Sequence, residues 1–207
     1  MIEDISSVNR LIALQSRQLY KSLNNNEKKL YQQVDLFLQT YCNFYNFNKN
    51  LAATAIQKFL EKYNIDMGNF NDTAKFPYQL GNSQFNLSRE EYDIFLVSSI
   101  LFTKHRFDIF YNLNQISFDN KSIALIGIGS GVELDLIKKK LIKDDICAYD
   151  LIISNFVKQY FSNVKINEYS FDTLNNTFDT IVAIELIEHI EKPYKFINDV
   201  YHALKDN

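Results

Sequence analysis

The stretch from Ser122 to Glu133, SIALIGIGSGVE, constrains the fold more than any other part of the chain. Its apolar run is typical of a strand that is buried on both faces. Glycine then occupies alternate positions at Gly127, Gly129 and Gly131, which is typical of backbone that turns sharply or is approached closely by another group. The stretch therefore predicts a buried strand followed by a tight loop that contacts a nucleotide-like ligand.

From Ser122 onward, short apolar runs alternate with stretches of helical pattern. This alternation predicts an α/β fold in which a parallel sheet carries helices on its faces. The expected strands are 122–127, 145–150, 164–169 and 178–184, and the expected helices are 131–142, 152–161 and 193–205.

The preceding part of the chain has a helical pattern, with apolar residues spaced three and four apart. One helix is marked by Ile5, Val8, Ile12 and Leu19, a second spans 27–47, and a third is marked by Leu51, Ala55, Phe59, Leu60 and Tyr63. Residues 66–86 have loop composition, and LSREEY is a capping-box signal that starts a helix expected over 88–112. We therefore expect a helical N-terminal segment over 1–115 and an α/β domain over 116–207.

Lys104, His105 and Arg106 place three potential cations within the helix expected over 88–112. We favour a solvated helix face with one partly buried histidine, because consecutive side chains point in different directions around a helix. The alternative is a clamp for an anionic substrate.

Composition narrows the classes of partner and compartment. The net charge of −3 and the pI near 5.6 do not favour nucleic acid. Two cysteines in 207 residues support neither a disulfide framework nor a cysteine zinc site. The N-terminus lacks the basic start and continuous apolar core of a secretory signal, and no segment is apolar enough to span a membrane. We expect a soluble cytoplasmic protein without a membrane partner; its oligomeric state is left open.

The glycine loop does not match the dinucleotide or phosphate-loop patterns. Val132 stands where a dinucleotide fingerprint has its last glycine, and no Gly-Lys-Ser/Thr follows. An acid, Asp150, ends the next expected strand, where its carboxylate can accept both hydroxyls of a ribose. The ligand predicted from these residues is a nucleoside without a pyrophosphate.

Four blocks in order resemble the class I S-adenosylmethionine-dependent methyltransferases: IGIGSG, AYDLI, FDTIVAIELIEHI and PYKFINDVYHALKDN. The resemblance covers residues 122–207. It implies a Rossmann-like parallel sheet of the class I methyltransferase type, with its first four strands present, preceded by an all-α N-terminal segment. It also implies S-adenosylmethionine as cofactor and methyl transfer as the activity.

The resemblance assigns expected roles to individual residues. Gly127, Gly129 and Gly131 would line the methionine and ribose portions of the cofactor, and Asp150 would bind the ribose hydroxyls. Glu185 would lie near the reactive methyl group and the methionine end. The residues expected beside the adenine are Ser170, Phe171 and Asp172.

Two features depart from the family pattern. Leu125 stands where the family usually has an acid, for which a neighbour such as Glu133 could compensate. The sequence also stops where a further strand would be expected, which would leave the fourth strand as an uncovered edge. We interpret residues 1–207 as part of a longer polypeptide; completion of the sheet by a partner is the alternative.

ELIEHI brings Glu185, Glu188 and His189 together near a strand end. Some related subfamilies use such residues to hold a divalent metal ion beside the accepting hydroxyl. We favour a structural role, because three ligands from one segment usually need a fourth from elsewhere. His189 is the candidate general base, since histidine can remove a proton near neutral pH.

The sequence thus predicts a methyltransferase that acts on a small-molecule acceptor, with the helical segment as a lid or substrate cap. The accepting atom, oxygen, nitrogen or carbon, is not specified. The alternative is a non-catalytic, degenerate or truncated methyltransferase-fold module used for binding or assembly.

Overall fold

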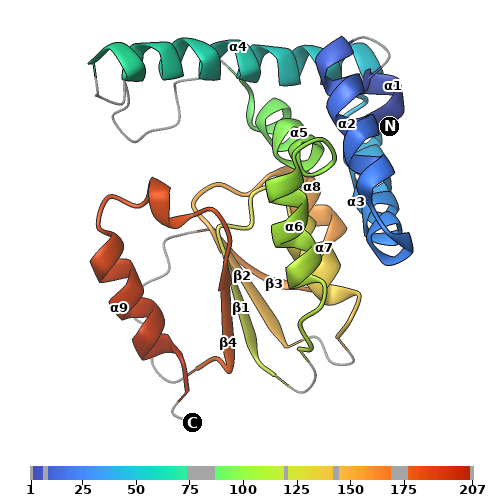
Figure 1. The fold of residues 1–207 in the computed structure, drawn as a ribbon. Helices are drawn as coiled ribbons and strands as arrows, with labels where there is room; N and C mark the ends of the chain where they lie inside the picture. The colour runs from blue at the N-terminus through green and yellow to red at the C-terminus, as the bar shows by residue number, and fades with distance from the viewer. Residues whose placement is uncertain are drawn as a thin grey trace. The chain divides into compact units, whose positions relative to one another are not determined.

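The computed structural model describes residues 2–6, 9–73, 87–118, 121–141, 145–168 and 177–205. The chain divides into two compact units, residues 1–113 and residues 114–207. The first unit is helical, and the second contains a sheet with helices on both faces (Figure 1).

The N-terminal unit is built from α1 (Ile2–Ser6), α2 (Arg10–Ser22), α3 (Asn25–Phe44), α4 (Lys49–Thr73), α5 (Arg89–Ile100) and α6 (Lys104–Leu113). The predicted capping box at the start of α5 is confirmed, because the Ser88 side chain accepts from the Glu91 amide and the Glu91 side chain accepts from the Ser88 amide. A second capping box, formed by Asn24 and Glu27, starts α3.

The single helix expected around Ile5, Ile12 and Leu19 is wrong, because it consists of two helices. Asn9 ends the first pattern and caps α2, since its side chain accepts from the amides of Leu11 and Ile12 at 3.1 Å each. Ile5, Ile12 and Leu19 are nevertheless buried as expected. Val8 lies outside the described residues.

The loop expected from residue 66 also needs correction, since α4 continues to Thr73. A side-chain carbon added at Gly68 would meet no other atom within 4 Å. An exposed helical glycine costs about 1 kcal/mol relative to alanine, which the rest of this long helix tolerates. Residues 74–86 lie outside the described part of the chain.

The helix expected over 88–112 is interrupted between α5 and α6. The Leu101 amide donates to the Ser98 carbonyl and the Thr103 amide donates to the Ser99 carbonyl, which closes the end of α5. α6 then begins at Lys104, directly after Thr103, whose carbonyl accepts from the Phe107 amide. Threonine favours such helix starts.

The second unit contains the predicted parallel sheet. Its strands are β1 (Ile123–Ile126), β2 (Ile146–Asp150), β3 (Lys165–Glu168) and β4 (Thr180–Ala183). They run parallel in the order β3-β2-β1-β4, with Ile123 opposite both Ile146 and Thr180. This is the strand order of a Rossmann-like sheet, so the predicted α/β fold class is confirmed.

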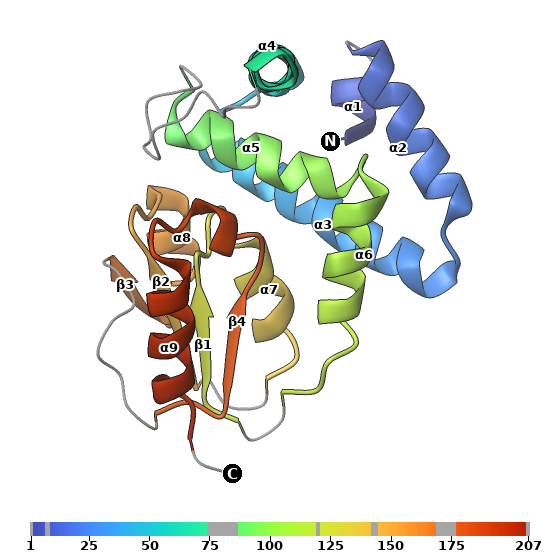
Figure 2. The ribbon, with the colours of Figure 1, turned by 60° about the vertical axis from the view of Figure 1, so that its left-hand side comes forward.

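Helices cover both faces of this sheet. In Figures 1 and 2, α9 (Pro193–Ala203) lies on one face, while α7 (Val132–Lys138) and α8 (Asn155–Tyr160) lie on the other. A short 3-10 helix, η1 (Ile187–His189), links β4 to α9. β1 passes into α7 and β2 passes into α8, and each of these helices returns the chain to the next parallel strand.

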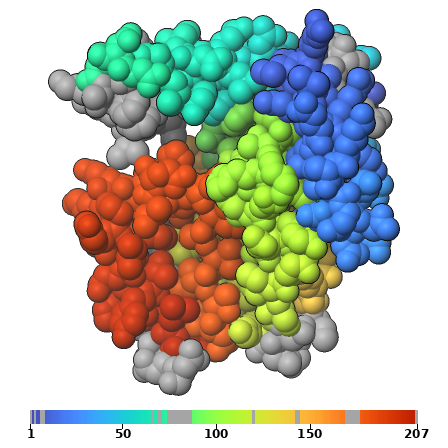
Figure 3. Space-filling view, viewed as in Figure 1, coloured from blue at the N-terminus to red at the C-terminus, as the bar shows by residue number. Residues whose placement is uncertain are grey.

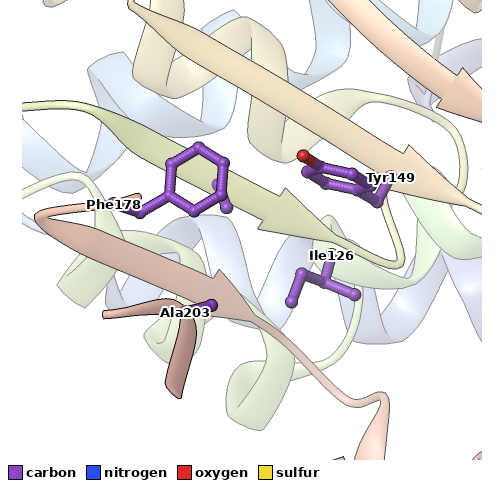
Figure 4. Packing of buried hydrophobic residues seen from close by; sticks show 5 residues of the cluster. Ile126, Tyr149, Phe178 and Ala203 are labelled. Carbon is purple, nitrogen blue, oxygen red and sulfur yellow. The ribbon is translucent and has the colours of Figure 1, made fainter. Parts of the chain in front are cut away.

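The core beneath α9 is a cluster of five buried residues. Figure 4 shows Phe178, Tyr149 and Ile126 turned toward the end of α9 at Ala203, and Ala124 completes the cluster. Phe196 and Val200 of α9 pack against it while remaining half-buried. Apolar side chains therefore hold α9 on the sheet and fix the path of the chain after β4.

The outer side of α9 carries exposed apolar side chains. Tyr194 is 88% exposed, Tyr201 is 72% exposed and Ile197 is 51% exposed, and α9 lies at the surface in the space-filling view (Figure 3). Among the described residues β4 is an outermost strand of the sheet. Within the same residues, no helix is both long enough and apolar enough to cross a membrane.

Candidate functional site

The strand order creates a reversal point between β1 and β4. The chain builds β2 and β3 on one side of β1 and then places β4 on the other side. In sheets of this type, ligands bind outside the carboxyl ends of the strands at such a point. The segments that follow β1 and β4 are the glycine loop and residues 184–189, so the candidate site lies there.

The glycine loop has the backbone conformation that its sequence predicts. Gly127, Gly129 and Gly131 have φ values of 73°, 49° and 85°, a region that side-chain-bearing residues rarely adopt. The Gly131 amide donates to the Ile128 carbonyl at 2.7 Å, which closes a tight turn. The loop therefore depends on glycine at these positions.

Asp150 lies beside this loop at the end of β2. Its Oδ2 accepts from the Gly129 amide at 2.8 Å, and its Oδ1 accepts from the Ile152 amide at 3.2 Å. The carboxylate is half-buried. The structure thus brings together two residues expected at one ligand.

Apolar side chains press against both ends of the glycine loop. A carbon added at Gly127 would lie 2.9 Å from Leu186 Cδ1, and one added at Gly131 would lie 2.8 Å from a ring carbon of Phe161. Leu186 comes from the segment after β4, and Phe161 follows α8. The loop is therefore enclosed by neighbours that leave no space for larger residues.

Glu185 lies just beyond the end of β4, at the reversal point. It is half-buried and has φ of 47°, an uncommon value for glutamate. Glu188 and His189 are exposed within η1. Across the described ranges, no three acidic, histidine or cysteine side chains form a group that could hold a metal ion.

Leu125, which stands where the resembled family usually has an acid, is buried within the sheet. Leu125 is 2% exposed and lies in register with Ala148 and Val182. Glu133 is half-buried in the first turn of α7. Ser170, Phe171 and Asp172, the residues expected beside the adenine, lie outside the described residues.

Sequence analysis missed an exposed apolar pair beside Asp150. Leu151 is 70% exposed and Ile152 is 39% exposed, directly after β2. The sequence AYDLI could have indicated this pair, because Leu151 and Ile152 follow Asp150 at the end of the strand and are therefore not buried as strand residues. They provide an apolar surface next to the carboxylate.

The three potential cations Lys104, His105 and Arg106 lie in the N-terminal unit, on α6. Lys104 forms an ion pair with Asp108. The expectation of a partly buried histidine is wrong, because His105 is exposed. These contacts support the solvated helix face rather than an anion clamp.

A shallow hollow beside β3 and α8 does not coincide with the reversal point. Its lining includes Phe161, Ile166 and Glu168. The Glu168 carboxylate accepts from Lys158 at 2.7 Å and from the Ile153 amide at 3.3 Å, and the Lys158 contact is the first cause of its lowered pKa. This carboxylate therefore serves the local structure.

Comparison with known proteins gives little sequence similarity. No protein-family model and no curated protein matches the chain. Among solved structures, it is similar to the crystal structure of coclaurine N-methyltransferase bound to N-methylheliamine and SAH, with a TM-score of 0.38 and 14% sequence identity. The match covers 97% of this chain and 62% of that chain, so the present chain spans less than two thirds of the other's length.

Proposed function

We propose that this protein is an S-adenosylmethionine-dependent methyltransferase that acts on a small-molecule acceptor. The observation that carries the proposal is the contact between Gly129 and Asp150 at the reversal point of the sheet. Asp150, a carboxylate at a strand end of the kind that can bind a ribose, lies beside the glycine loop. Because glycine has no side chain, the backbone of this loop can lie close to a ligand.

The residues around this contact favour a nucleoside over a dinucleotide. Val132, at the position of the missing glycine, is 2% exposed, so its side chain fills the space that a dinucleotide fingerprint keeps open for close packing. Leu151 and Ile152 offer an apolar surface on which a base such as adenine can rest. The fit is to a nucleoside with a short polar extension.

Methyl transfer needs alignment more than chemical activation. When bound, S-adenosylmethionine would supply an electrophilic methyl group on a sulfonium sulfur for transfer to the acceptor, whose proton would pass to a base of this chain. We propose that Glu185 lies near the methionine end, where a carboxylate favours positive charge. His189, exposed near the same strand end, is the proposed general base.

The acceptor is proposed to be a small molecule bound beside the cofactor. We propose that the helical N-terminal unit acts as a lid or substrate cap, because such helices can exclude water and shape an acceptor pocket. We expect residues 122–207 alone to aggregate or to behave as a molten globule that binds hydrophobic dye. If that piece is instead monodisperse, unfolds cooperatively and binds S-adenosylmethionine as tightly as the full chain, the N-terminal unit is a detachable domain and the cap proposal loses its support.

The decisive experiment measures S-adenosylmethionine affinity by calorimetry for the wild type and for two variants, Asp150→Ala and Asp145→Ala. Asp150→Ala should weaken binding by about 1.5–3 kcal/mol, because a charge-assisted hydrogen bond to the ribose is lost. Asp145→Ala is the matched control, since Asp145 is exposed at the opposite end of β2 and should leave the affinity unchanged. Equal affinities in all three forms would overturn the assignment.

The alternative is a non-catalytic module with the same fold. Its specific support is Leu125, because the buried apolar side chain leaves no carboxylate at that point of the site. Cofactor binding without transfer to any of a panel of small amines, phenols and carbon acids would favour this alternative. Transfer to one of them, abolished in Asp150→Ala, would exclude it.

A further inference from the structure

Glu185 has a backbone conformation that must be held by its surroundings. With φ of 47°, it shares the left-handed region, among described non-glycine residues, only with Asn46. Asparagine enters this region readily because its short side chain can hydrogen-bond to nearby backbone, whereas glutamate enters it rarely. Such residues persist only where neighbouring contacts fix them.

Leu186, the next residue, is fixed at both its side chain and its backbone. Its side chain packs against the cluster beneath α9 and contacts the bare backbone of Gly127. Its carbonyl accepts from the His189 amide at 2.9 Å and so begins η1. The peptide that follows Glu185 is therefore held in one orientation.

The contact with Gly127 also joins the two loops of the reversal point. One loop carries the glycines and donates to the Asp150 carboxylate through the Gly129 amide, and the other carries Glu185. Leu186 belongs to the second loop and its side chain contacts Gly127 of the first, so a shift of either loop must move this side chain. Packed side chains of this kind change position in discrete steps rather than gradually.

We propose that Leu186 is a positioning residue: through its contact with Gly127 it holds Glu185 in the left-handed conformation and keeps the glycine loop in its binding shape. Its effect on the methyl donor rests on the proposed function. Leu186 itself needs no contact with the cofactor.

Two variants of equal kind separate positioning from general packing. Leu186 and Val200 are both half-buried and pack against the same buried cluster, so changing either to alanine removes apolar contacts with it. Of the two, Leu186 is the residue that contacts Gly127. Among correctly folded variants, Leu186→Ala should weaken S-adenosylmethionine binding roughly tenfold to a hundredfold, as small misplacements at a site do. Val200→Ala should leave the affinity within twofold of wild type, and Leu186→Met should restore most of it.

A double-mutant cycle tests the contact without any ligand. Gly127→Ala places a carbon against Leu186, so its effect on the free energy of unfolding should be smaller in the Leu186→Ala background than in wild type. Additive effects would overturn the contact. If the cycle shows coupling but wild type binds no S-adenosylmethionine, the proposed function fails while the contact stands. If wild type binds and Leu186→Ala binds equally well, the positioning role is wrong.

Discussion

At the scale of single residues, Asp179 joins three parts of the α/β unit at the amino end of its sheet. Its Oδ2 accepts from the Ser122 amide and hydroxyl at 2.7 Å each and from Lys205 Nζ at 2.9 Å. These hydrogen bonds, the Ser122 hydroxyl first, hold the pKa of Asp179 well below its usual range. One carboxylate thus ties the starts of β1 and β4 to the segment after α9.

This lowered pKa predicts an acid-sensitive contribution to stability. A carboxyl group whose pKa is lower in the folded state stabilises the fold above its unfolded pKa, here 3.8, and loses that effect as the pH falls. Asp179→Asn should therefore reduce the free energy of unfolding at pH 7, and its difference from wild type should shrink as the pH is lowered below about 4. Urea unfolding at pH 7 and pH 3 measures both; an equal difference at the two values would contradict the prediction.

Single residues also show where sequence reasoning works. The tight glycine loop and the place of Asp150 at a strand end were predictable, because both follow from local spacing along the chain; their roles toward a cofactor stay predictions. The conformation of Glu185 was not, because it depends on the contact between Leu186 and Gly127, which are far apart in sequence. In the sequence, nothing distinguishes Leu186 from other apolar residues that follow a strand, so its contact with Gly127 could not be predicted.

At the scale of elements, a buried polar network joins α3 to α5, two helices that lie side by side in Figure 2. Asp93 is fully buried, and its carboxylate accepts from the Tyr41 hydroxyl at 2.9 Å and from Arg89 Nε at 2.9 Å. Burial first, and then the Asp93 charge, raise the pKa of Tyr41 far above its ordinary range. A buried carboxylate is tolerated only with such partners.

Removing one donor from this network should destabilise the N-terminal unit. Tyr41→Phe leaves the Asp93 carboxylate buried with one hydrogen bond fewer, which should cost about 1–3 kcal/mol. Tyr63→Phe on α4 removes the same oxygen from a residue that is 46% exposed and should change stability by less than about 0.5 kcal/mol. Thermal unfolding followed by circular dichroism would compare them, and equal midpoints would refute the role of the hydroxyl.

Elements were predictable where one periodicity continued and less so where a cap interrupted it. All four expected strands were found; β1 and β4 are short, mostly apolar runs, as is typical of parallel strands, whereas β3 is mostly polar. The break at Thr103 was missed, because apolar positions continue on both sides of it and a single capping residue carries the signal. Asn9 was missed for the same reason.

At the scale of the whole molecule, the outer side of α9 presents an unusual surface. Tyr194, Ile197 and Tyr201 recur at spacings of three and four and are at least half exposed. They adjoin the stripe of Phe196, Val200 and Ala203 that packs on the sheet, so the apolar side of α9 is wider than its contact. Exposed apolar stripes next to an outermost strand favour association between molecules.

A single substitution on this stripe should therefore reduce self-association of the chain. Ile197→Lys places a charge within the apolar side of α9, whereas Asn198→Lys adds the same charge at an exposed polar neighbour. Both variants bring the net charge of −3 closer to zero, which by itself promotes association. Light scattering across a concentration series should fall for Ile197→Lys and stay level or rise for Asn198→Lys. If scattering falls equally in both variants, charge rather than the apolar stripe governs association, and the surface of α9 has no special part in it.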